Sequence, residues 1–192
     1  MSAPLSQDRL TRVALGFGIA VPFFYGSQFI AALLYPGYNF LSQSASQLGS
    51  DSARYPAVFN VGAILTGLAT LAASWGFLRG LYGFGTPRAL AWITTATIAA
   101  SAFMHFWAGV FPMPNPRHGQ NPFQIAGVAV PVLIGVAVWK SVRAPVRIYF
   151  VVTVLALAAL MADVVPLDRQ LYDGLFQRLL ALAVFPPVGA GD

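Results

Sequence analysis

Two histidines, His105 and His118, are the side chains with the widest chemical repertoire in this sequence. A neutral imidazole can serve as a general base, and two histidines with one carboxylate suffice for a catalytic zinc site. Asp163 or Asp51 would supply that carboxylate. The HExxH and HxxxH spacings are absent, however, and the chain has no Cys. We therefore expect no bound metal and no cofactor, and keep His105, His118 and Asp163 as candidate catalytic residues.

Serine residues in the segment 42–46 suggest a second kind of chemistry. Ser42, Ser44 or Ser46 with a histidine and Asp51 would make a Ser-His-Asp set, in which the histidine removes the proton of the attacking hydroxyl. The GxSxG turn that exposes the nucleophile in many hydrolases does not occur. A hydrolase is therefore an alternative hypothesis, and whether the protein is an enzyme stays open.

An arginine and an aspartate fall within or beside apolar segments near the end of the chain. A charge inside a bilayer costs free energy unless it is paired or reaches water. Arg178 and Asp163 are expected at similar depth on consecutive antiparallel segments, so we expect them to form an ion pair, with Arg178 also holding loop carbonyls. A direct role in binding a ligand is the alternative.

The elements that must position these residues are transmembrane helices. Of the 192 residues, 57% are hydrophobic and only 9% are charged, whereas soluble domains carry roughly 25% charged residues. Continuous apolar runs favour helices over the alternating strands of a barrel. The sequence predicts a single all-α membrane domain, residues 1–192, in which six helices form a bundle. The spans are expected near 13–35, 57–79, 89–111, 123–140, 146–166 and 173–188.

The positive charges predict the orientation of these spans. With the N-terminus inside, seven Lys or Arg residues lie in the cytoplasmic segments and three in the outer ones. Positive residues are enriched in cytoplasmic connections. We therefore expect a multi-pass protein of the cytoplasmic (inner) membrane with both termini in the cytoplasm. The net positive charge is explained by this topology, so no nucleic-acid partner is expected.

Strongly polar side chains gather in the outer third of the predicted spans. Such positions are functional candidates, because polar groups at membrane depth are costly. Together with one serine of the first outer loop they form the expected ligand-binding set: Gln28, Ser46, Asn60, His105, Asp163 and Arg178.

Small and hydroxylated residues recur every three or four positions on the second and third spans. Such stripes allow close packing of membrane helices. They comprise Gly62, Thr66, Thr70 and Ser74 on one span, and Thr94, Thr97, Ser101, His105 and Gly109 on the other. We expect both stripes to serve in helix packing, with His105 either in a structural hydrogen bond or beside a cavity.

Several sequence blocks also resemble a known family. They are YPGYNFLSQSASQLGS followed by FNVGAILTG, VFP after the third span, and DxxPLD followed by GLFQR. In this order they resemble the domain-of-unknown-function 998 family of bacterial six-span membrane proteins. The resemblance implies a fold and a topology but no activity. The positions that carry it are Pro36, Gly37, Tyr38, Ser46, Leu48, Gly49, Asn60, Phe111, Pro112, Gly174, Gln177 and Arg178.

Three functional hypotheses follow. The first is a protein without chemistry of its own that binds a lipid or another amphiphile in a polar and aromatic cavity at its outer face, or serves as an accessory subunit of a membrane complex. Its expected partners are membrane lipids, other membrane subunits or a second copy. The alternative is an intramembrane lipid-modifying hydrolase that uses His105 or His118 with an Asp. The third is a small transporter, which the lack of ionisable residues in the inner halves of the spans disfavours.

Overall fold

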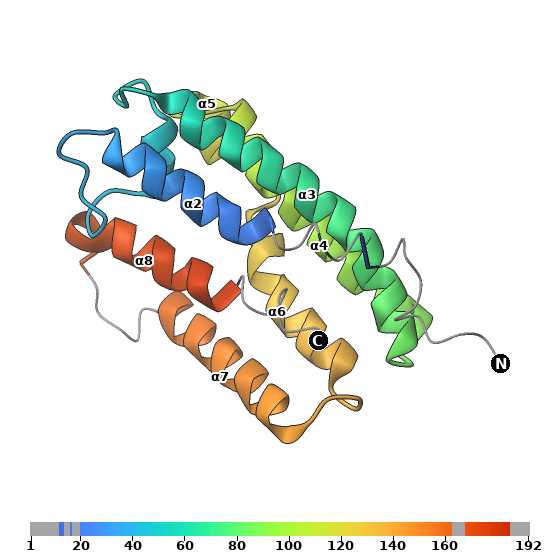
Figure 1. Ribbon diagram of the computed structural model, residues 1–192. Helices are drawn as coiled ribbons and strands as arrows, with labels where there is room; N and C mark the ends of the chain where they lie inside the picture. Colours follow the sequence, from blue (N-terminus) through green and yellow to red (C-terminus); the bar gives the residue numbers. More distant parts are fainter. Residues whose placement is uncertain (1–11, 14–15, 17–19, 163–167, 185–192) are drawn as a thin grey trace.

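A bundle of helices makes up the described part of the chain. The computed structural model describes residues 12–13, 16, 20–162 and 168–184, and every regular element within them is helical. Figure 1 shows these elements in chain order: α2 (Ala20–Leu33), the 3-10 helix η3 (Ala45–Gly49), α3 (Pro56–Gly83), α4 (Arg88–Val110), α5 (Pro116–Gly119), α6 (Gln124–Val138), α7 (Ala144–Met161) and α8 (Arg169–Val184). The predicted all-α class is confirmed.

Four segments are long and apolar enough to cross a membrane by length and composition: α3, α4, α5 together with α6, and α7. They agree with the second to fifth predicted spans, and they make the chain a multi-pass membrane protein. The described part of the first predicted span is the 14-residue α2. The sixth corresponds to the 16-residue α8, whose backbone is non-helical at Tyr172. Six complete crossings and the cytoplasmic termini stay predictions.

The connections distinguish the two ends of the bundle (Figure 1). The segments 34–55 and 111–123 lie together at one end, here called the long-loop end. The turns 84–87 and 139–143 lie at the opposite, short-loop end. The turn between α3 and α4 is tight because Gly85 adopts a φ of +73°, which side chains rarely tolerate. Thr86 Oγ1 then donates a hydrogen bond to the carbonyl of Ala137 at 2.8 Å, which ties this turn to α6.

The antiparallel pair α3 and α4 forms the most extensive helix contact, and its close approach depends on small residues. A Cβ built on Gly67 would lie 2.7 Å from the carbonyl oxygen of Ala102 on α4. One built on Gly109 would lie 2.5 Å from the carbonyl oxygen of Asn60 on α3. Most members of the predicted stripes are buried along this pair: Thr66, Thr70, Ser74, Thr94, Ser101, His105 and Gly109. Both stripes are therefore packed inside the bundle, but not only against each other. A Cβ on Gly62 would collide with the side chain of Ser27 on α2, and the His105 ring lies 5.2 Å from that of Phe24 on α2.

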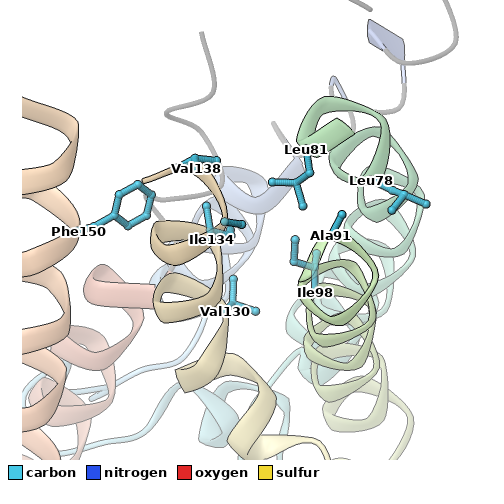
Figure 2. Packing of buried hydrophobic residues seen from close by; sticks show 9 residues of the cluster. Leu78, Leu81, Ala91, Ile98, Val130, Ile134, Val138 and Phe150 are labelled. Atoms are coloured by element: carbon cyan, nitrogen blue, oxygen red, sulfur yellow. The ribbon is translucent and has the colours of Figure 1, made fainter. Parts of the chain in front are cut away.

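An apolar core joins α3, α4, α6 and α7 toward the short-loop end. Figure 2 shows side chains from all four helices converging there, with Phe150 of α7 lying against α6. A Cβ on Gly135 would come within 3.0 Å of the Phe150 ring, so the absence of a side chain at position 135 makes room for the aromatic ring. A second, smaller apolar cluster of Ala31, Ala45, Leu48 and Phe59 packs η3 against α2 and α3 at the long-loop end.

Candidate functional site

The segment 34–55 folds over the long-loop end of the bundle and carries most of the polar contacts there. Gly37 has a φ of +79° and begins the turn after α2. Asn39 Oδ1 accepts a hydrogen bond from the backbone N–H of Leu41 at 2.9 Å. Further along the same segment, Ala45–Gly49 forms the 3-10 helix η3. The carbonyl groups of Phe40, Leu41 and Gln43 in this segment contact α8.

Arg178 of α8 binds this loop through its guanidinium group. Its Nη1 donates to the carbonyl oxygens of Phe40 at 2.7 Å and Gln43 at 3.1 Å, and to that of Gly174 at 2.8 Å. Its Nη2 donates to the hydroxyl of Tyr38 at 2.7 Å. The guanidinium carbon also lies 4.8 Å from the centre of the Phe40 ring. The expectation that Arg178 holds loop carbonyls is confirmed.

The loop and α8 approach each other closely beside this arginine. A Cβ on Gly174 would lie 2.6 Å from the carbonyl oxygen of Phe40 and would also collide with that of Gln43. Next to it, the backbone N–H of Leu175 donates to the carbonyl of Leu41 at 2.9 Å. Gln177 Oε1 accepts from the backbone N–H of Ala45 at 2.7 Å. Only a residue without a side chain fits at position 174.

Tyr38 completes the same cluster from the loop side. Its hydroxyl accepts the bond from Arg178 and lies 2.9 Å from the carbonyl oxygen of Ser44, to which it donates. Burial raises the pKa of Tyr38 above its ordinary value, while the hydrogen bond and positive charge of Arg178 act in the opposite direction. Burial is the larger effect, so the tyrosine stays protonated at neutral pH. We call Tyr38, Gly174, Gln177 and Arg178 the α8 clamp.

Ser46 and His118 come together from segments that are 72 residues apart. Ser46 lies on η3 and His118 on the short helix α5, and the distance from Ser46 Oγ to His118 Nε2 is 3.0 Å. His118 Nδ1 lies 2.7 Å from the carbonyl oxygen of Phe111. A carbonyl can only accept, so Nδ1 carries the proton and a neutral ring leaves Nε2 to accept from the serine hydroxyl. This tautomer suits a general base.

The structure distinguishes between the three serines that were candidate nucleophiles. Among Ser42, Ser44 and Ser46, the hydroxyl in contact with a histidine is that of Ser46. Asp51 is exposed, and the group that orients His118 is the Phe111 carbonyl instead of a carboxylate. The pair is therefore a serine–histidine dyad with a backbone acceptor. We call it the Ser46–His118 pair.

The other predicted site residues lie apart from this pair. His105 is buried on α4, where its Nδ1 lies 3.0 Å from the carbonyl of Ser101 and its ring stands edge-on to Phe24 at 5.2 Å. Gln28 is buried on α2. Asn60 Nδ2 donates to the carbonyl of Gly49 at 3.0 Å and so holds the end of η3 against α3.

Asp163, the predicted ion-pair partner of Arg178, lies outside the described residues, so that pairing stays a prediction. Within the described ranges, no group of three His or Asp residues is placed to hold a metal ion. The contacts that sequence reasoning missed are those of Tyr38, Gly174 and Gln177. These positions carry the family resemblance, but their roles depend on the close approach of α8 to a loop far away in sequence.

The comparisons with known proteins show the family of the chain but give no activity for it. No curated protein and no solved structure gives a significant match to the chain. The family described as "Protein of unknown function (DUF998)" matches residues 18–189, which includes both the α8 clamp and the Ser46–His118 pair. Because this match extends over nearly the whole sequence, the chain belongs to the DUF998 family of proteins of unknown function.

Proposed function

We propose that this membrane protein binds an ester-bearing amphiphile at the long-loop end and attacks its acyl group with Ser46. The observation that carries the proposal is the 3.0 Å contact between Ser46 Oγ and His118 Nε2. A nucleophile hydrogen-bonded to a base whose second nitrogen is held by another group is the arrangement used in nucleophilic acyl transfer. Both side chains are half-buried, which leaves them within reach of a substrate at the interface.

The proposed acyl transfer uses Ser46, His118, the ester and water or a second alcohol, and no other reactant is needed. As Ser46 Oγ forms a bond to the acyl carbon, its proton moves to His118 Nε2. The ester C–O bond then breaks, and the leaving alcohol takes that proton from His118. Water or a second alcohol attacks the acyl-serine through the same base, which restores the free hydroxyl. The Phe111 carbonyl keeps the imidazole in the required orientation throughout.

The α8 clamp has a supporting role in this proposal. Arg178 is engaged with loop carbonyls and with Tyr38, so it stabilises the loop that carries η3. Gln177 binds the backbone of Ala45, the residue before Ser46. We infer that the clamp sets the position of the serine and that substrate contacts are made at the Ser46–His118 pair.

Reaction with a fluorophosphonate probe tests the proposal directly. The purified full-length protein should become labelled on the peptide containing Ser46, as measured by mass spectrometry. Labelling should disappear in Ser46→Ala and slow by at least tenfold in His118→Asn. The neighbouring variant Ser44→Ala is the matched control and should be labelled like the wild type. Absence of label in the folded wild type, or equal labelling of Ser46→Ala, would contradict the proposal.

Head-group binding without chemistry is the second candidate. The same pair offers a hydroxyl and an imidazole to the polar group of a lipid, which agrees with the amphiphile-binding hypothesis from the sequence. It would be favoured if lipid co-purifies with the wild type, is lost in Ser46→Ala, and is not consumed. The accessory-subunit and transporter hypotheses, and the bacterial inner membrane as location, stay predictions.

A further inference from the structure

The outward face of α7 at the short-loop end carries a groove unrelated to the Ser46–His118 pair. It has a volume of about 310 Å³ and is lined by Trp139, Ala144, Arg147, Ile148, Val151 and Val152. The inward face of the same helix carries Phe150, Thr153 and Leu157, which are buried in the bundle (Figure 2 shows Phe150). The groove therefore opens toward the surroundings of the bundle and not into its core.

Arg147 is fixed at the edge of this groove but keeps free hydrogen-bonding capacity. Its Nε donates to the carbonyl of Trp139 at 2.8 Å, and its guanidinium carbon lies 5.8 Å from the centre of the Trp139 ring. Among the residues that the structure describes, its Nη1 and Nη2 atoms have no acceptor. A guanidinium that is held through Nε presents its two terminal nitrogens as a fork suited to phosphate oxygens.

The positive charges around Arg147 favour a negatively charged ligand. Lys140 and Arg143 lie in the same turn, and the segment 140–147 contains no acidic residue. The apolar part of the groove then continues along α7 through Ile148, Val151 and Val152, whose side chains are 62%, 44% and 58% exposed. A basic end followed by an apolar channel matches a phosphate followed by an acyl chain.

We propose that this groove binds an anionic phospholipid. The phosphate contacts Arg147, with Lys140 and Arg143 adding attraction for the negative head group, and one acyl chain lies over Ile148, Val151 and Val152. Trp139 stands at the level of the head groups, where tryptophan is enriched in membrane proteins. A zwitterionic lipid offers the same chains without the net negative charge, so selectivity for the anionic head group distinguishes the site from general lipid contact.

Native mass spectrometry of the full-length protein, titrated with phosphatidylglycerol or phosphatidylcholine, tests the site. The wild type should retain phosphatidylglycerol with at least tenfold higher affinity. Arg147→Gln should remove most of that preference, and Val151→Trp, which fills the groove but keeps the charge, should weaken binding as well. Arg88→Gln is the matched control, because Arg88 is an exposed cation at the same end of the bundle.

Thermal unfolding in lipid-free detergent separates loss of the site from loss of the fold. Val151→Trp leaves the Arg147–Trp139 bond in place, so it tests the groove even if Arg147→Gln melts early. Equal affinity of the wild type for both lipids would overturn the proposal. It would also be overturned if Arg88→Gln lost as much preference as Arg147→Gln, since net charge alone would then explain the binding.

Discussion

Arg178 Nη1 lies 2.7 Å from the carbonyl oxygen of Phe40, although the two residues are 138 positions apart in the chain. This bond joins the last described helix to the first long loop. Arg178 holds two carbonyl oxygens and one hydroxyl of the loop at the same time. Together with Gln177 and the backbone N–H of Leu175, it fixes how the loop lies on α8.

Replacing this arginine should destabilise the protein. Arg178→Gln removes charged donors and leaves half-buried carbonyls with fewer partners, so we expect a loss of about 2 kcal/mol in the free energy of unfolding. Thermal unfolding in detergent would measure it. Arg54→Gln is the control, because Arg54 is exposed and its guanidinium carbon lies 5.3 Å from the centre of the neighbouring Tyr55 ring. An Arg178→Gln midpoint no lower than that of Arg54→Gln would contradict the clamp.

A glycine pair tests the close approach of the loop to α8. Gly174→Ala places a Cβ against the carbonyl oxygens of Phe40 and Gln43, so the loop or the helix must move, at about 2 kcal/mol. Gly80→Ala on α3 meets no heavy atom within 4 Å and should stabilise its helix by up to about 1 kcal/mol. Opposite signs for the two changes in thermal midpoint are therefore expected. Equal shifts would mean that no tight contact exists at position 174.

The sequence was most informative where a single helix or a composition rule decides the structure. Apolar runs predicted the four spanning segments, and the period of small residues predicted that α3 and α4 carry closely packed faces. Both depend on spacing within one element. The depth of Arg178 likewise predicted that it would need acceptors near the end of a span.

The pairing of distant loops could not be predicted in the same way. Three serines and two histidines allowed six combinations, and spacing did not favour any of them. The contact between Ser46 and His118 arises because η3 and α5 lie at the same end of the bundle. The close approach of the loop to Gly174 could not be predicted either, because nothing within the sequence of α8 indicates which loop covers it.

Alkaline pH should weaken the α8 clamp through Tyr38. Its pKa is raised in the folded protein, mainly by burial, so the protein favours the protonated form. The corresponding stability is present below the unfolded pKa of about 10 and is lost as pH rises through the folded value. The thermal midpoint should therefore decrease more between pH 8 and a pH above 10 in the wild type than in Tyr38→Phe. Tyr55→Phe controls for removing an exposed phenol, and parallel profiles for wild type and Tyr38→Phe would refute the effect.

The two ends of the bundle should differ in their accessibility from the cytoplasm. Basic residues of the short-loop end include Arg88, Lys140 and Arg143, which favours a cytoplasmic location for that end. The chain has no Cys, so single cysteines can be placed without background: Ser141→Cys in the short-loop turn and Ser52→Cys in the long loop, both at exposed positions. In intact cells an impermeant maleimide should label the Ser52 variant and leave the Ser141 variant unlabelled until the membrane is opened. The reverse pattern would invert the predicted topology and move the Ser46–His118 pair to the cytoplasmic side.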